Sequence, residues 1–111
     1  MITLTARFTM RAGRVALALR RVAAVKVQSD REQPGTLLYL VHRELDARKR
    51  PTRALLFYEC YLHAKALDAH LASESWQALT TRWSECFEGT AKDIQVTSLE
   101  RIAGFVHLDA S

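Results

Sequence analysis

Four segments of the chain carry the hydrophobic pattern of β-strands. Residues 2–9 alternate apolar and polar side chains, which is the pattern of a strand with one buried face. Residues 36–44 and 54–62 are rich in aliphatic and aromatic side chains, and the polar segment between them contains Pro51. We expect these two segments to pair as an antiparallel hairpin with a long tip. Residues 94–102 alternate again and predict the last strand.

Two further segments carry the periodicity of amphipathic helices. After a predicted turn at residues 11–13, apolar side chains recur at three- and four-residue spacing to about Gln28, and the pair Pro34-Gly35 prevents a longer helix. Residues 64–87 predict a second, continuous helix, with Gly89 placed to cap its C-terminus. The apolar stripe of this helix consists of Leu67, Leu71, Ala78, Leu79, Trp83 and Phe87.

The order of these elements is βαββαβ, in a single domain that spans residues 1–111. Two right-handed crossovers place both helices on one face of a four-stranded antiparallel sheet. The predicted class is therefore α+β with ferredoxin-like topology. Residues 102–111 follow the last strand, and we expect them to form a C-terminal arm that packs on a partner.

The second face of the predicted sheet has no helix to cover it. In residues 36–44, one set of alternating side chains contains Leu37, Tyr39 and Val41, and the other contains Leu38 and Leu40. Both faces of this strand are therefore largely apolar, and an exposed apolar face favours association. We expect a second copy of the chain to cover it, which predicts a homodimer formed through the open sheet face.

Composition excludes several classes of protein. The chain has 111 residues, of which 49% are hydrophobic and 25% are charged, and this fits one globular domain. No window approaches the roughly 20 apolar residues of a membrane span, and the N-terminus lacks the apolar core of a secretory signal. We therefore expect a cytoplasmic protein with no membrane partner. Cys60 and Cys86 lack metal-binding spacing and the four histidines are scattered, so we predict buried thiols and no metal site.

Positive charge is concentrated in the first half of the chain. Residues 1–53 contain twelve Lys or Arg and four Asp or Glu, whereas residues 54–111 contain four and eight. The positive side chains are spread over the first helix and the hairpin tip, which is typical of a solvated surface. The strands also lack the paired aromatic platform of RNA-binding modules with this topology, so no nucleic-acid partner is expected.

His70 is the first candidate for chemistry. It lies three residues after Leu67 and one before Leu71, so its ring points toward the sheet or toward a cavity beside it. By spacing alone, a hydrogen-bonded core histidine is the favoured interpretation. The other interpretation is a base, because an imidazole with its unperturbed pKa near 6.5 accepts a proton at neutral pH.

Glu59 is the second candidate, because a carboxylate in the middle of an apolar strand needs a partner. Either it forms an ion pair with Arg43 or Arg7, or it orients a histidine or a substrate hydroxyl. Arg43 in turn either pairs with Glu59 or holds the anion of an ionised phenol. Five aromatic side chains are either core residues or the lining of a flat pocket for a small aromatic substrate. They are Tyr39, Tyr58, Tyr61, Trp76 and Trp83.

Three runs, QPGTLLYLVHREL, LFYECY and ALDAHLASESWQAL, resemble the antibiotic biosynthesis monooxygenase family, which includes quinol monooxygenases. The likeness covers most of the chain. Its strongest points are Pro34-Gly35, Leu37, Tyr39, Arg43, Phe57, Tyr58-Glu59, Leu67, Ala69-His70-Leu71 and Ser73. The resemblance implies a dimeric α+β barrel. It also implies cofactor-free oxidation of quinols and aromatic polyketides in some members, and haem degradation or isomerisation of small metabolites in relatives.

The sequence departs from the family pattern at several positions. Tyr61 stands where Trp is usual, which keeps an aromatic surface and adds a hydroxyl. His63 stands where Asp or Asn normally caps the second helix, so we expect a cap weaker by roughly 0.5–2 kcal/mol. The haem-degrading relatives carry Asn, Trp and His at the positions of Arg7, His70 and Thr80, and none of these matches. Haem is therefore disfavoured.

These observations give one leading hypothesis and two alternatives. In the leading hypothesis the protein is a monooxygenase without any cofactor, which oxidises a quinol or a polycyclic phenol with dioxygen. Such a reaction needs the substrate as an electron-rich anion, and His70 is the expected base, assisted by Glu59. The alternatives are a non-catalytic, stress-associated barrel that binds a small aromatic molecule, and an isomerase that transfers a proton with the same base.

Overall fold

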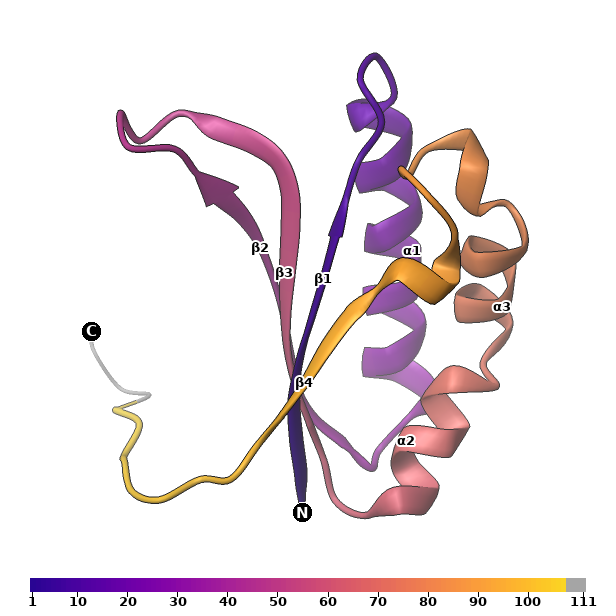
Figure 1. The fold of residues 1–111 in the computed structure, drawn as a ribbon. Helices are drawn as coiled ribbons and strands as arrows, with labels where there is room; N and C mark the ends of the chain where they lie inside the picture. Colours follow the sequence, from indigo (N-terminus) through magenta and orange to yellow (C-terminus); the bar gives the residue numbers. More distant parts are fainter. Residues whose placement is uncertain (108–111) are drawn as a thin grey trace.

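The computed structural model describes residues 1–107 and confirms the predicted α+β, ferredoxin-like fold (Figure 1). Its sheet has the order β2-β3-β1-β4, with every neighbouring pair antiparallel. The strands are β1 (Ile2–Thr9), β2 (Thr36–Leu45), β3 (Pro51–Tyr61) and β4 (Gln95–Leu99). The helices are α1 (Val15–Glu32), α2 (Ala64–Leu71) and α3 (Glu74–Thr81), with the 3₁₀ turns η1 (Trp83–Glu85) and η2 (Ala91–Asp93).

All three α-helices lie on one side of the sheet, and the chain after β4 leaves on the other side (Figure 1). Among residues 1–107, no helix has both the length and the apolar character that crossing a membrane requires. The last four positions of the predicted C-terminal arm, 108–111, lie outside the described residues.

The core is formed where the alternating strand pattern meets the helical stripe of α1. In β1, Leu4, Ala6 and Phe8 are buried on the helix side, as the alternation predicts. The ring of Phe8 lies 5.0 Å from Phe57, 4.8 Å from Trp83 and 5.0 Å from the ring of Phe87, measured between centroids. This aromatic cluster fixes the end of the sheet that lies far from α2.

The prediction of one continuous helix over residues 64–87 is wrong. The helix stops at Leu71, and a new helix begins at Glu74. Ser73 adopts an extended conformation (φ −64°, ψ 150°), and its hydroxyl accepts a hydrogen bond from the backbone N–H of Trp76 at 3.3 Å. A serine at this position favours capping over helix continuation, because its side chain satisfies an N–H that would otherwise have no partner.

The hairpin tip is shorter than predicted. It consists of residues 46–50 only, since β2 continues to Leu45 and β3 begins at Pro51. The side chain of Asp46 accepts hydrogen bonds from the backbone N–H groups of Arg48 (2.8 Å) and Arg50 (3.0 Å), which closes the turn. Proline is tolerated at the first position of a strand, because no ladder bond is lost there.

The start of α2 is also capped better than the sequence indicated. The ring nitrogen Nδ1 of His63 accepts a hydrogen bond from the backbone N–H of Ala66 at 3.2 Å, so the expected loss of a cap acceptor is wrong. Gly35 brings this same turn close to the sheet, since a Cβ atom at Gly35 would lie 2.6 Å from the Cβ of Ala66. The Pro34-Gly35 pair therefore both ends α1 and makes room for α2.

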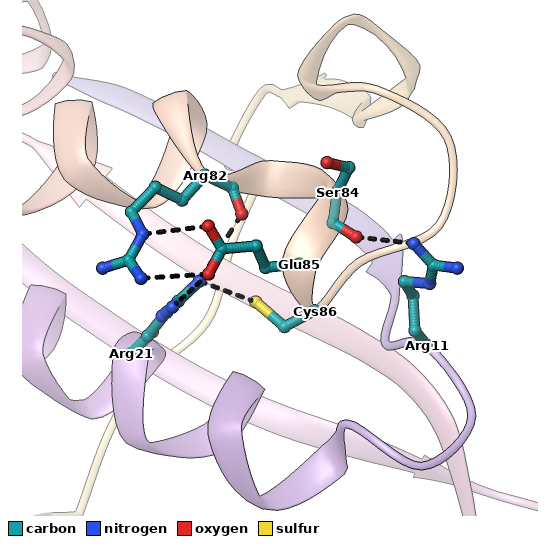
Figure 2. Close-up of polar contacts among 6 residues, drawn as sticks. All are labelled: Arg11, Arg21, Arg82, Ser84, Glu85 and Cys86. Carbon is teal, nitrogen blue, oxygen red and sulfur yellow. Dashed lines mark hydrogen bonds and ion pairs between the residues drawn. The ribbon is translucent and has the colours of Figure 1, made fainter.

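A charged cluster fastens η1 to α1 (Figure 2). The carboxylate of Glu85 accepts hydrogen bonds from Arg21 on α1 at 2.7 Å and from Arg82 at 3.0 and 3.1 Å. Before α1 begins, Arg11 donates to the carbonyl oxygen of Ser84 at 2.6 Å. These bonds hold the turn that carries Trp83 into the aromatic cluster.

The sheet face opposite the helices is exposed and apolar, as the sequence predicts. Leu40 on β2 is 49% exposed, and in the segment after β4 Ile102, Phe105 and Val106 are more than 70% exposed. Cys60, on the same face, is buried and carries a free thiol, as does Cys86 on the helix side.

Replacing Ser73 tests the break between α2 and α3. We expect Ser73→Ala to lower the free energy of unfolding by about 1 kcal/mol, because the α3 cap is lost. The matched control is Ser75→Ala: the buried hydroxyl of Ser75 has no hydrogen-bond partner within residues 1–107, so its removal is expected to be neutral or stabilising. Urea unfolding measures both variants, and equal losses would contradict the cap assignment.

Candidate functional site

A hollow of about 360 Å³ lies between the sheet and the helices α2 and α3. Its volume is within the range typical of small-molecule sites. Most of its wall is apolar, and only a few polar side chains reach it. The lining residues are Leu4, Ala6, Glu59, Leu67, His70, Leu71, Trp76, Thr80, Ala91, Ile94 and Val96.

His70 lies in the last turn of α2, only 2% exposed, with its ring pointing toward the sheet as the helical spacing predicts. Aromatic rings surround it: the centroid of the imidazole lies 5.2 Å from Tyr39, 5.6 Å from Tyr61 and 5.6 Å from Trp76. The break at Ala72 and Ser73 is what turns α3 so that Trp76 approaches the imidazole.

Two side chains from the end of α1 anchor one nitrogen of this ring. His70 Nδ1 lies 3.1 Å from Gln33 Oε1 and 3.3 Å from the hydroxyl of Ser29. The same amide oxygen of Gln33 accepts a hydrogen bond from the hydroxyl of Thr36 at 3.3 Å. Because an amide oxygen only accepts, we assign the proton of His70 to Nδ1 and the lone pair to Nε2. Within residues 1–107, Nε2 has no hydrogen-bond partner.

Burial keeps this imidazole neutral. Removal from water disfavours the charged form and lowers the pKa of His70 to about 4. At neutral pH the ring therefore offers a lone pair at Nε2, and it is not a cation that would hold an anionic ligand.

Glu59 lies on β3, 6% exposed, and lines the same hollow. The phenol of Tyr61, two residues along the strand, donates a hydrogen bond to its carboxylate. Burial raises the pKa of Glu59, and the bond from Tyr61 opposes that shift. The expected ion pair is wrong: Arg7 pairs with Glu44, and Arg43 Nε donates to the carbonyl oxygen of Thr52 at 2.6 Å.

Two tyrosines, Tyr39 and Tyr61, lie next to the His70 ring and do not line the hollow. Tyr39 lies opposite Glu59 in the β2–β3 register, and its buried hydroxyl has no hydrogen-bond partner within residues 1–107. Burial, and then the charge of Glu59, raise the pKa values of both Tyr39 and Tyr61 above the usual range of a phenol. Both side chains are therefore neutral at physiological pH.

Three of the predicted site residues lie elsewhere. Arg43 is directed to the hairpin backbone, as described above. Tyr58 lies on the open sheet face, with its hydroxyl 3.5 Å from Arg101. Trp83 belongs to the aromatic cluster around Phe8, and its indole N–H donates to the carbonyl oxygen of Glu88 at 3.0 Å. The structure thus brings together Glu59, His70 and Trp76, with Tyr39 and Tyr61 behind them, and does not bring Arg43, Tyr58 or Trp83 to the hollow.

Several residues of the site are not evident from the sequence. Gln33 and Ser29 anchor His70, and Ile94 and Val96 close the hollow from the far end of the chain. The sequence does contain an indication that Ser29 is buried, because Ser29 falls on the same stripe of α1 as Val22 and Val25. Within residues 1–107, no group of three or more His, Cys, Asp or Glu side chains is placed to hold a metal ion.

Comparison with solved structures supports the fold. Solved structures with a similar fold include PA3566 from Pseudomonas aeruginosa (20% identity, 92% of this chain and 94% of that chain, TM-score 0.74). Rv0793 from Mycobacterium tuberculosis is also similar (20% identity, 93% and 96% coverage, TM-score 0.74). A third similar structure is a putative antibiotic biosynthesis monooxygenase from Caulobacter crescentus (16% identity, 92% and 90% coverage, TM-score 0.76). At these identities the likeness shows the fold alone.

A sequence search of curated proteins gave no match. The sequence model for antibiotic biosynthesis monooxygenases matches residues 1–82, from β1 through α3, and so includes Gln33, Glu59 and His70. The earlier resemblance is confirmed: the chain belongs to the antibiotic biosynthesis monooxygenase family.

Proposed function

We propose that the protein is a cofactor-independent monooxygenase that oxidises a quinol or a polycyclic phenol with dioxygen. The observation that carries this proposal is the state of His70: a buried, neutral imidazole, anchored through Nδ1, with the lone pair of Nε2 available beside an apolar hollow. Membership of a monooxygenase family supports the reaction class.

In this mechanism Nε2 of His70 accepts the proton of a substrate hydroxyl. The resulting aromatic anion passes an electron to dioxygen, and the two radicals combine to form a carbon–oxygen bond. Loss of water then gives the oxidised product, so one oxygen atom enters the product and the other leaves as water. The hydrogen atoms of that water come from the substrate, and no external reductant is consumed.

The low basicity of His70 sets the energetic cost of the first step. A phenol with a pKa near 10 lies about 6 units above an imidazole with a pKa of about 4, which is about 8 kcal/mol uphill. Attraction between the imidazolium and the phenolate formed at about 4 Å returns about 4 kcal/mol at an effective dielectric constant near 20. The remaining ~4 kcal/mol fits within the barrier of about 16 kcal/mol for a turnover of about 10 s⁻¹.

Oxygen uptake tests the proposed activity. Protein freed of metal and flavin is expected to consume dioxygen with at least one member of a panel of hydroquinones and anthrones. We expect His70→Gln to reduce kcat by at least about 100-fold, because the proton acceptor is lost. His107→Gln, which replaces an exposed histidine, is the matched control and is expected to retain the wild-type rate.

Three results would contradict the oxygenase proposal. Turnover by His70→Gln at the wild-type rate would exclude the histidine as base. Thermal stabilisation by an aromatic ligand without oxygen uptake would favour the non-catalytic binding protein instead. Substrate turnover under argon would favour the proton-transfer isomerase.

The neutral state of His70 also predicts how stability depends on pH. The pKa of His70 falls from about 6.5 in the unfolded chain to about 4 in the folded one, so protons bind the unfolded state preferentially between these values. Stability is therefore expected to fall as pH decreases from 7 to 4.5, by about 2 kcal/mol from this group alone. Glu59 acts in the opposite direction, because its raised pKa favours the folded state at low pH.

Urea unfolding at pH 7 and pH 4.5 isolates the contribution of His70. Between these pH values, wild type is expected to lose about 2 kcal/mol more than His70→Gln, in which Glu59 titrates as before. His107→Gln is expected to lose as much as wild type. Equal losses in wild type and His70→Gln would mean that the ring is not held neutral by burial.

We also propose that the protein acts as a homodimer formed through its open sheet face. The exposed apolar side chains of β2 and of the segment after β4 support this proposal. Wild type is expected to sediment as a dimer at micromolar concentration, and Leu40→Lys to dissociate it, since Leu40 lies on that face. Val27→Lys is the matched control: Val27 is 46% exposed, as Leu40 is at 49%, but it lies on α1. A monomeric wild type would overturn the proposal.

A further inference from the structure

The charge pattern of the hollow restricts its ligand more narrowly than the reaction class does. Among residues 1–107, no arginine or lysine lines the hollow, although the chain contains sixteen such residues. The positive side chains expected there are engaged elsewhere, Arg7 with Glu44 and Arg43 with the hairpin backbone. His70 supplies no positive charge either, because its ring is neutral.

The two titratable groups that reach the hollow are hydrogen-bond acceptors. Nε2 of His70 holds a lone pair, since Nδ1–H is used by Gln33. The carboxyl group of Glu59 already receives the hydrogen of Tyr61 and has further lone pairs. Thr80 donates its own hydroxyl to the carbonyl oxygen of Gln77 at 3.2 Å, which leaves only lone pairs toward a ligand.

Glu59 and His70 belong to one cluster of side chains. Tyr39 lies opposite Glu59 in the strand register and 5.2 Å from the His70 ring. Tyr61 donates to Glu59 and lies 5.6 Å from the same ring. Both Glu59 and His70 also line the same hollow, so one ligand in the hollow can contact both.

An anionic ligand would be disfavoured in this setting. A second carboxylate would enter a mostly apolar site in which the described residues supply Glu59 and no positive charge to neutralise either group. Whether Glu59 is ionised or protonated, the lining supplies no counter-charge, and an unpaired buried anion is strongly destabilised. A hydroxyl group, by contrast, can donate to either acceptor at little cost.

From this arrangement we infer that the site selects its ligand by charge: Glu59 accepts a hydrogen bond from a second hydroxyl group of the proposed quinol and excludes carboxylated analogues. This inference rests on the proposed function for the location of the site, and it deepens that proposal by naming the charge selectivity of the site and the residue that sets it. Glu59 is then a specificity-determining residue, and its proposed role does not require it to accept the reacting proton.

Anaerobic binding measurements on matched naphthalene compounds test the inference without any turnover. The probes are 1,4- and 2,3-dihydroxynaphthalene, 2-naphthol and 3-hydroxy-2-naphthoate, with dissociation constants determined by titration calorimetry at pH 7. We expect the tighter-binding diol to bind about tenfold more tightly than 2-naphthol, because of the second donated hydrogen bond. We expect 3-hydroxy-2-naphthoate to bind at least about tenfold more weakly than that diol.

The variant Glu59→Gln removes the negative charge of Glu59 and keeps a side chain of nearly the same shape. Glutamine keeps an acceptor oxygen for Tyr61, and the variant is expected to bind 3-hydroxy-2-naphthoate at least about tenfold more tightly than wild type does. Glu74→Gln removes the same charge from an exposed position on α3 and is expected to bind all four probes as wild type does. Circular dichroism confirms that both variants are folded.

Two outcomes would overturn the inference: binding of 3-hydroxy-2-naphthoate by wild type as tightly as either diol, or no binding of either diol. The oxygen-uptake assay fails independently of these measurements. If the diols bind with the expected preference and no dioxygen is consumed, the selectivity stands and the monooxygenase proposal falls. If dioxygen is consumed and carboxylated substrates are turned over equally well, the monooxygenase proposal stands and the selectivity falls.

Discussion

The hydrogen bond from His70 Nδ1 to the side chain of Gln33 is the constraint on which the site depends. It joins the end of α1 to the end of α2, and it determines which ring nitrogen is left for a ligand. A buried imidazole without such a partner would lose the hydrogen bonds that water gives it, at a cost of roughly 1–3 kcal/mol. Anchored in this way, the ring is neutral and fixed in orientation. These are the properties that a proton acceptor beside a mostly apolar hollow requires.

The hollow beside His70 persists because the surrounding packing is rigid on both sides. Aromatic rings support the histidine from the sheet and from α3, while Phe8, Trp83 and their neighbours fill the opposite end of the core. The hollow between them is lined mostly by apolar side chains and is partly open to solvent, since Val96 in its wall is 59% exposed. The two ends of the helix–sheet interface therefore differ: the end around Phe8 and Trp83 is filled by packed aromatic rings, and the end around His70 has space for a ligand.

Family membership and site geometry answer different questions about this protein. The family match shows that the chain belongs to the antibiotic biosynthesis monooxygenase family, but the same fold supports several chemistries. The electrostatics of the hollow narrows the range of ligands. Glu59 and His70 are hydrogen-bond acceptors with no cation beside them, so they bind ligand hydroxyl groups better than ligand carboxylates. The many positive charges of the first half of the chain do not alter this balance, since none of them reaches the hollow.

The sequence by itself determined the four strands, the first helix and the order of the elements. Alternation in β1 gives its buried face correctly, and the spacing in α1 correctly places Val22 and Val25 inside, because a side chain's direction follows from local backbone geometry. The spacing also placed Leu19 on this stripe, but Leu19 is 38% exposed. The same rule places His70 inward. It also assigns Tyr58 to the face opposite Glu59, since neighbouring strand residues point to opposite sides.

Only the tertiary structure decided which residues meet. Whether Ser73 continues a helix or caps a new one depends on a competition between similar local energies, and the structure adopts the cap. The partner of Glu59, Tyr61, lies two residues away on the same strand, whereas Gln33, the partner of His70, lies 37 residues away in sequence. A pattern of side-chain types records which residues are buried. It does not record which of two arginines, or which of several hydroxyls and amides, reaches a given buried group, because that follows from strand register and helix placement over the whole chain.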